Sequence, residues 1–150
     1  CRFSVWNILV FSFIVYYCLY IYLRFSYLFL FSLSLETIIS FNASIEKDWH
    51  LYAVYVPNPN EGPLPTVFKY KPSNNYALKD SIVQEFPITY FDDDFGVEVS
   101  YYKNTALFKQ KINILKNTMF RIEGSISYMC CNAQTCIPLE KQFTITANQD

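Results

Sequence analysis

Two stretches near the C-terminal end alternate between apolar or small residues and polar ones, the period-2 pattern of a strand with one buried face. In the first stretch the inward set is Phe120, Ile122, Gly124, Ile126 and Tyr128. In the second stretch it is Phe143, Ile145 and Ala147. Three of the five cysteines, Cys130, Cys131 and Cys136, lie between them within seven residues. We therefore expect these cysteines at or near a turn between two strands, where the backbone can bring two sulfurs together.

Shorter segments of the same kind follow one another from residue 35 onward. They are rich in β-branched and aromatic residues, and turn signals such as Pro57–Pro63 separate them. Besides the two strands above, the expected strands are Thr37–Ile45, His50–Val56, Pro65–Lys71, Tyr76–Val83, Val97–Tyr102 and Ala106–Ile114. In the last of these, Gln110 interrupts an apolar face. About eight short strands without a convincing amphipathic helix predict an all-β sandwich of the immunoglobulin-like type.

The N-terminal end has a different character. Phe3 to Leu23 are 21 residues without a charge, and a second apolar run continues to Leu35. A run of this length can span a bilayer as a helix. We expect residues 1–34 to be a membrane-targeting segment, either an anchor or an unusual signal, with a non-native terminus as the alternative. Residues 35–150 are then expected to be one domain that folds alone as a soluble all-β unit.

Composition narrows the function classes. The net charge of −1 gives no electrostatic case for binding nucleic acid. With three Gly and one His, the chain has little material for a phosphate-binding loop or a metal site built from histidines. No cofactor is expected.

The spacing of Cys131 and Cys136 leaves four residues between them. A ring this small closes as a disulfide if the turn folds back, and the chain-entropy model gives roughly 2 kcal/mol for it. Two interpretations stay open: a structural bridge that closes a hairpin, and a pair suited to reversible exchange. Zinc is disfavoured, because three cysteines and the distant His50 lack the paired spacing of a structural site.

Cys130 and Cys131 are neighbours, and neighbours on a strand point to opposite faces. If the parity of Ile126 and Tyr128 continues, Cys130 faces the core and Cys131 faces out. A buried cysteine behaves as a small hydrophobic residue. The parity therefore makes Cys130 the bystander of the cluster.

The segment Tyr128–Pro138 resembles the redox segment of the N-terminal periplasmic domain of the thiol:disulfide interchange protein DsbD. In that family a strand ends in an aromatic residue and a cysteine, and a short loop, a second cysteine and a proline follow. Further resemblances lie in Glu46–Tyr52 (an early strand), Gly62–Thr66 (a turn), Asp92–Gly96 (the cap loop) and Lys109–Ile112 (the next strand). Together they cover about Leu35 to Ala147.

The resemblance implies an immunoglobulin-like fold with one redox-active pair, Cys131 and Cys136, and a free Cys130. It implies a periplasmic thiol:disulfide interchange carrier, a protein-disulfide reductase. Such a carrier takes electrons from a thioredoxin-like domain of a membrane electron transporter and passes them to oxidised partners. Asp93, Asp94 and Phe95 would form the cap loop that shields the pair, and His50 and Tyr52 match positions that flank it.

The chain departs from the family pattern at several points, and the loop between Cys131 and Cys136 is one residue shorter than in the best-known form. Cys130 is an extra thiol, and the hydrophobic start replaces the usual first strand. Asp94 stands where the best-known form has an aromatic cap residue, which leaves the shielding to Phe95. The alternative function is a non-enzymatic immunoglobulin-like binding or assembly module with a structural disulfide. On that view Tyr52 and Phe95 are core aromatics, His50 is an ordinary histidine, and the acidic triplet is a solvated turn.

Overall fold

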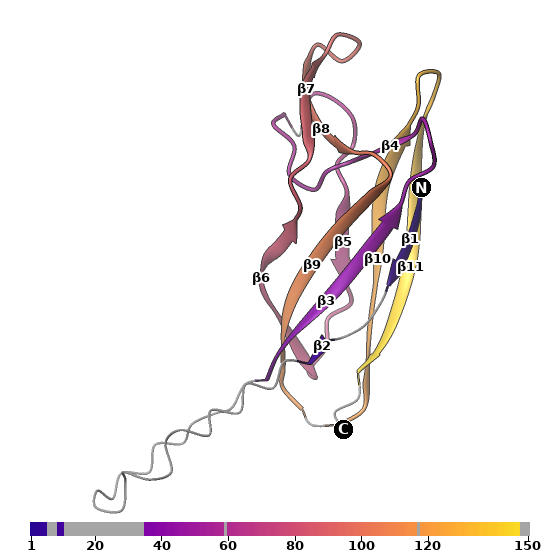
Figure 1. Ribbon diagram of the computed structural model, residues 1–150. Coiled ribbons are helices and arrows are strands. Elements are labelled where there is room, and N and C mark those ends of the chain that lie inside the picture. Colours follow the sequence, from indigo (N-terminus) through magenta and orange to yellow (C-terminus); the bar gives the residue numbers. More distant parts are fainter. Residues whose placement is uncertain (6–8, 11–34, 59, 117, 148–150) are drawn as a thin grey trace, which may run out of the picture.

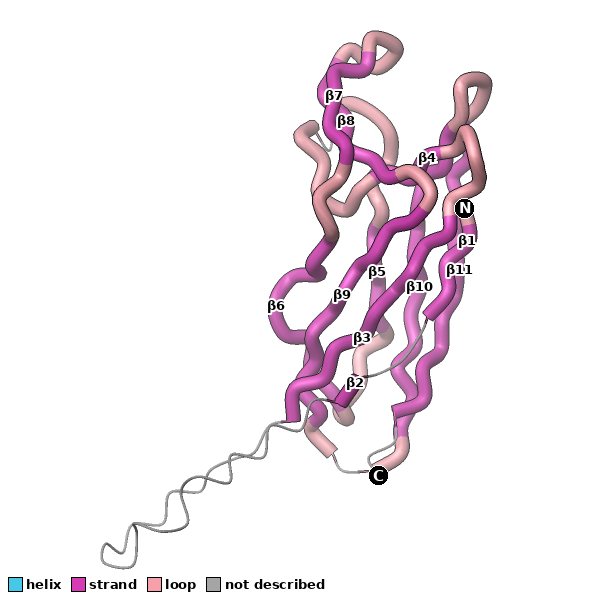
Figure 2. The backbone as a smooth tube through the Cα atoms, in the orientation of Figure 1, coloured by secondary structure: helices cyan, strands magenta, loops and turns pink. Residues whose placement is uncertain are grey.

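The structure is a computed structural model that describes residues 1–5, 9–10, 35–58, 60–116 and 118–147. Within these residues the regular elements are strands joined by loops, with no helix (Figure 2). The strands are β1 (Arg2–Val5), β2 (Leu9–Val10), β3 (Leu35–Ser44), β4 (His50–Tyr52), β5 (Val67–Tyr70), β6 (Tyr76–Gln84), β7 (Ile88–Asp92), β8 (Val97–Tyr102), β9 (Thr105–Ile114), β10 (Phe120–Cys131) and β11 (Cys136–Ala147).

The strands form two antiparallel sheets that pack face to face (Figure 1). The first sheet has the order β1-β3-β9-β6, with β2 also beside β3. The second has the order β11-β10-β4-β8-β7, and β5 pairs with β10 below β4. The predicted all-β sandwich of the immunoglobulin-like type is confirmed.

The core lies between the sheets and is built by the predicted alternation. Every second residue of β3, β9 and β10 is buried, as the period of a strand requires. Phe41, Phe108 and Ile122 are among the side chains with 0% exposure. Burying each such side chain contributes about 1.5–3 kcal/mol relative to leaving it in water. The need to bury these side chains therefore sets the register of the central strands.

Two strands differ from the sequence prediction. β4 ends at Tyr52 and does not run to Val56, because Gln84 Oε1 accepts the backbone N–H groups of Val54 and Tyr55 (2.8 and 3.2 Å) and draws this backbone toward β6. β7 was not predicted. It pairs along one edge with β8, and four of its five residues are exposed. A strand exposed in this way does not need the alternation of apolar and polar residues from which a strand is predicted, so its sequence does not reveal it.

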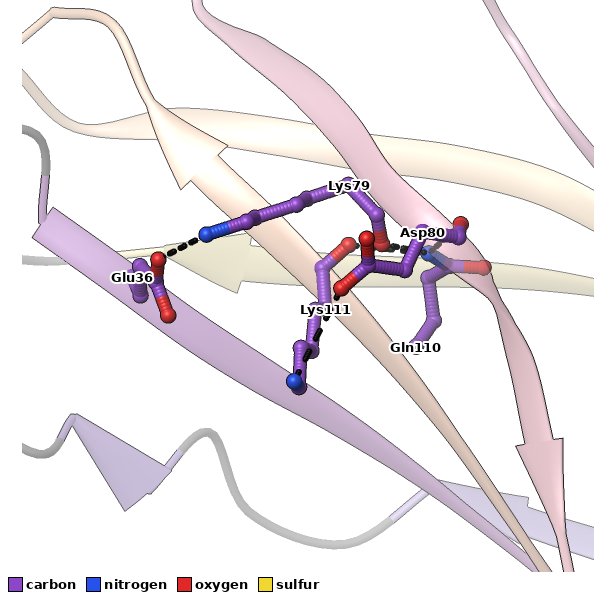
Figure 3. Close-up of polar contacts among 5 residues, drawn as sticks. All are labelled: Glu36, Lys79, Asp80, Gln110 and Lys111. Carbon is purple, nitrogen blue, oxygen red and sulfur yellow. Dashed lines mark hydrogen bonds and ion pairs between the residues drawn. The ribbon is translucent and has the colours of Figure 1, made fainter.

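Gln110, the residue that interrupts the apolar face of β9, lies opposite a bulge in β6. Lys79 pairs with Lys111 and Val83 pairs with Lys109, so three residues of β6 face one residue of β9. Gln110 is 4% exposed, and its amide Nε2 donates to the carbonyl oxygens of Lys79 (3.0 Å) and Asp80 (3.2 Å), as Figure 3 shows. The side chain thereby replaces ladder hydrogen bonds that the bulge removes.

The start of the chain contributes to the sandwich. Residues Arg2–Val5 pair with Phe41–Ser44 of β3, although the sequence resemblance predicts no first strand there. The ring of Phe3 packs against those of Tyr128 and Phe108, at 4.8 and 6.0 Å between centroids.

Most of the predicted targeting segment, residues 6–8 and 11–34, lies outside the described residues. In the part of the chain that the structure covers, no helix has the length and apolar character to cross a membrane. The domain boundary at residue 34 stays a prediction.

The position of Gln110 leads to a test of the β6 bulge. In the variant Gln110→Leu the carbonyls of Lys79 and Asp80 lose their donor, and loss of a partly buried hydrogen bond costs about 1–3 kcal/mol. We expect the free energy of unfolding, measured by urea denaturation, to fall by about 2 kcal/mol. Gln142→Leu is the matched control: Gln142 is exposed on β11, so its replacement should change stability by less than about 0.5 kcal/mol. Equal stabilities of the two variants would contradict this role of Gln110.

Candidate redox site

Cys131, the last residue of β10, lies directly between one residue of β11 and one residue of β4. Cys131 is the register partner of Cys136 on β11 and of His50 on β4. Directly opposite residues on antiparallel strands put their side chains on the same face, with Cβ atoms about 5 Å apart. Cys131 and Cys136 are joined by a disulfide, and their Cα atoms are 4.1 Å apart. The pair predicted from sequence therefore forms a bond, with His50 beside it.

Asn132 builds the turn that makes this pairing possible. Its backbone N–H donates to the Thr135 carbonyl (2.9 Å), and its Oδ1 accepts the backbone N–H groups of Gln134 and Thr135, both at 2.9 Å. An asparagine that holds its own turn in this way is a common local motif. Asn132 was not among the predicted site residues, although an Asn directly after a strand is a recognisable turn signal.

The two sulfur-bearing residues differ in their access to solvent. Cys136 is exposed, whereas Cys131 has 1% exposure. Cys131 faces away from the main core, as strand parity predicts, and on that outer face it is covered by other side chains. Tyr52, Val99 and Tyr101 form a second small cluster that covers it. These residues come from β4 and β8, so no local pattern around Cys131 reveals them.

His50 and Tyr52, the two residues predicted to flank the pair, do lie beside it. The His50 Nε2 and the Tyr52 hydroxyl are 3.1 Å apart, at hydrogen-bond distance. The His50 ring also lies 4.9 Å from the Tyr101 ring, centroid to centroid. The face that carries the disulfide is thus lined by one imidazole and an aromatic layer.

Burial and nearby charges shift the acid–base properties of this layer. Partial burial and, after it, the positive charge of Lys103 lower the pKa of His50, while Asp92 acts in the opposite direction. The imidazole is therefore neutral near pH 7. Burial, with Asp92 and Tyr101 as lesser causes, raises the pKa of Tyr52 to about 12. The Tyr52 hydroxyl thus keeps its proton and can donate it in a hydrogen bond.

The predicted cap loop is the turn between β7 and β8, at the same end of the sandwich as the β10–β11 turn (Figure 1). Asp93 and Asp94 are exposed, and Phe95 is 41% exposed. The preceding Asp92 is buried and organises the turn: its carboxylate accepts the Tyr90 hydroxyl (2.6 Å) and the backbone N–H groups of Asp94 and Phe95. Shielding of the pair by Phe95 stays a prediction.

The electrostatic link between this turn and the cysteine site runs through Asp92. Burial alone would raise the pKa of Asp92, but the hydrogen bonds from Tyr90 and from the Phe95 and Asp94 backbones lower it below its usual value. The carboxylate is therefore charged at neutral pH, and its field acts on His50 and Tyr52. The residues predicted for the cap loop were Asp93, Asp94 and Phe95, with the shielding assigned to Phe95, and the buried Asp92 was not among them.

Cys130 faces the core, as strand parity predicts, and has 1% exposure. The prediction that it stays free is wrong, because it forms a disulfide with Cys1. The two residues are 129 positions apart in the chain, so only the pairing of β1 with β3 brings Cys1 to this end of β10. The remaining cysteine, Cys18, lies outside the described residues.

Comparison with known proteins identifies the family. A family model described as thiol:disulfide interchange protein DsbD, N-terminal, matches residues 29–148. Among solved structures, the reduced DsbD N-terminal domain of Neisseria meningitidis matches with a TM-score of 0.50 and 16% sequence identity, over 75% of this chain and 78% of that one. A comparison with curated protein sequences finds no match. The chain belongs to the family of DsbD N-terminal domains, whose activity is thiol:disulfide interchange.

Proposed function

We propose that Cys131 and Cys136 are the exchanging pair through which this domain performs its family's thiol:disulfide interchange. The observation that carries the proposal is the asymmetry of their bridge at a hairpin end: Cys136 is exposed and Cys131 is covered. A partner thiolate can reach an exposed sulfur, while a covered sulfur is protected from other reactants. Membership of the DsbD N-terminal family supports this assignment.

In the reductive half-reaction the thiolate of a reduced partner attacks the Cys136 sulfur. The Cys131–Cys136 bond breaks, its electron pair leaves with Cys131 as a thiolate, and a mixed disulfide joins Cys136 to the partner. A second partner thiolate then attacks its own half of the mixed disulfide and releases Cys136. The partner leaves oxidised and the domain leaves as a dithiol, two electrons richer.

The oxidative half-reaction reverses these steps with a different partner. The exposed Cys136 thiolate attacks the partner's disulfide, and Cys131 resolves the mixed disulfide. Cys131 must lose its proton before it can attack. A neutral imidazole can accept that proton, and His50 stands opposite Cys131 on the same face of the sheet. We assign His50 the role of proton acceptor through its Nδ1. In the tautomer that this requires, His50 Nε2–H donates to the Tyr52 hydroxyl oxygen, and this hydrogen bond holds the imidazole.

The partners we propose are thioredoxin-like proteins, both as electron donor and as acceptors. The proposed setting is the periplasm, with electrons supplied by a membrane electron transporter. Of the predicted targeting segment 1–34, we propose only residues 11–34 for attachment to the membrane, because Cys1–Val5 and Leu9–Val10 belong to the sandwich. No cofactor is needed, because the two cysteines carry both electrons.

Trapping of the mixed disulfide tests the order of attack. In Cys131→Ser the resolving thiol is missing. The Cys136 thiolate should therefore accumulate as a mixed disulfide when it is offered a single-cysteine thioredoxin activated as its thionitrobenzoate disulfide, from which thionitrobenzoate leaves. In Cys136→Ser the remaining thiol is covered, so trapping should be weak or absent. Intact-mass spectrometry under non-reducing conditions measures both adducts. Trapping through Cys131 but not Cys136 would contradict the proposed order.

The rival function, a binding module with a structural bridge, predicts a different result for stability. We expect the double variant Cys131→Ala/Cys136→Ala to lose exchange with thioredoxin and no more than about 2 kcal/mol of unfolding free energy, since the closed loop is short. Failure of this variant to fold, combined with no reduction of the wild-type pair by thioredoxin, would support the binding module.

The role of His50 can be tested by its titration, because it is the single histidine of the chain. We expect its pKa, followed by NMR of the imidazole protons, to lie below 6.5. Lys103→Gln should raise it, because a nearby positive charge disfavours the imidazolium. Lys116→Gln is the matched control and should leave it unchanged. A wild-type pKa at or above 6.5 would contradict a neutral proton acceptor at pH 7.

Phe95 provides the test of the cap. If its ring shields the reduced pair, Phe95→Ala should speed alkylation of Cys131 or Cys136 with little change in the thermal midpoint, because an aromatic residue that is 41% exposed contributes little to the core. Alkylation rates of the reduced protein and thermal midpoints measure the two effects. An unchanged rate would show that Phe95 is not the cap, and a large fall in the midpoint would show that it is an ordinary packing residue.

A further inference from the structure

Two disulfides meet at adjacent residues of β10 but lie on opposite faces of it. Cys131 bonds to Cys136 on the outer face, under the Tyr52 cluster. Cys130 bonds to Cys1 on the inner face, within the main core. Successive side chains of a strand point to opposite sides of the sheet. The backbone of β10 therefore stands between the two bridges.

The inner bridge connects the two sheets. Cys1 directly precedes β1 of the first sheet, and Cys130 belongs to β10 of the second, with 6.4 Å between their Cα atoms. Nearby, the Phe3 ring packs edge-on against the Tyr128 ring, at 4.8 Å between centroids. A short stretch of chain is thus fastened to the same end of β10 that carries Cys131, both by the bridge and by aromatic packing.

Access to the two bridges differs. Exchange requires a thiolate to approach a disulfide sulfur in line with the bond. Cys130 is 1% exposed, and Cys1 is partly buried and packs against the core. Cys136, by contrast, is exposed. Cys131, once reduced, is held on the far side of the strand from Cys130, so it is also poorly placed to attack the inner bridge.

We propose that Cys1–Cys130 is a permanent bridge that takes no part in exchange and holds the end of β10 while the Cys131–Cys136 bond opens and closes. This rests on the proposed function only in taking Cys131–Cys136 as the exchanging pair. When that bond is reduced, the tip of the β10–β11 hairpin loses its cross-link. The inner bridge then keeps the backbone of Cys131 in register with β4, beneath Tyr52.

Peptide mapping of the whole chain tests the permanence of the inner bridge. Thiols that are free in the oxidised protein are first blocked with unlabelled iodoacetamide. The protein is then reduced with thioredoxin and its reductase under native conditions and labelled with heavy iodoacetamide. We expect heavy label on Cys131 and Cys136 and only traces on Cys1 and Cys130, until urea is added. Equal labelling of Cys1 and Cys130 under native conditions would overturn the proposal.

The double variant Cys131→Ser/Cys136→Ser separates this proposal from the proposed function. It keeps the inner bridge alone, and we expect that bridge to resist thioredoxin. Reduction of the inner bridge in this variant would overturn its permanence whatever the wild-type pair does. Failure of thioredoxin to reduce Cys131–Cys136 in the wild type would overturn the proposed function instead, and a resistant inner bridge in the variant would still support the structural assignment.

The holding role has its own measurement. In Cys1→Ser the inner bridge is lost and Cys130 remains as a small buried residue. We expect alkylation of reduced Cys131 to become severalfold faster than in the wild type, while that of the already exposed Cys136 stays unchanged. Gln110→Leu is the matched control, because it lowers stability at the β6 bulge without touching this end of β10. The same increase in Gln110→Leu, or no increase in Cys1→Ser, would overturn the holding role.

Discussion

The antiparallel pairing of β10 is the interaction on which the rest of this structure depends. All twelve residues of β10 pair with β11, and on its other side β10 pairs with β4 and β5. A shift of the register by one residue would turn Ile122 and Ile126 out of the core and bring Arg121 into it. The hydrophobic effect therefore sets the register, and the register sets which cysteine faces which way.

That single register places two disulfides on opposite faces of β10 at adjacent residues. Cys130 continues the inner face and lies in the core, where a disulfide connects the two sheets. Cys131 continues the outer face, where its partner Cys136 is open to solvent. In an irregular loop, adjacent cysteines could exchange partners. In a paired strand the pleat keeps them on opposite faces, so the two disulfides at adjacent residues keep separate partners.

The surroundings of the outer pair are assembled from distant segments. Tyr52 comes from β4, Tyr101 and Val99 come from β8, and a charge that acts on Tyr52 comes from Asp92 at the end of β7. Asp92 also closes the β7–β8 turn by accepting two backbone N–H groups. One buried carboxylate thus links the conformation of the predicted cap loop to the electrostatics of the layer beside Cys131.

The sequence by itself determined the features that depend on neighbours in the chain. Strand alternation predicted β10 and β11, the inward direction of Cys130 and the anomaly of Gln110, because the pleat repeats every two residues whatever the fold. The Cys131–Cys136 pairing was also within its reach, since a turn of four residues can close it locally. The DsbD-like motifs around these residues pointed to the family that the comparison then established.

Only the tertiary structure decided what depends on contacts across the fold. The burial of Cys131 could not be predicted, because the residues that cover it lie on β4 and β8. The partner of Cys130 could not be predicted either, since the bridge spans 129 positions and requires β1 to lie along β3. β7 could not be predicted from sequence because an exposed edge strand needs no apolar face. In each case a packing or pairing interaction between segments far apart in the chain decides the structure. The periodicity of neighbouring residues gives no information about such interactions.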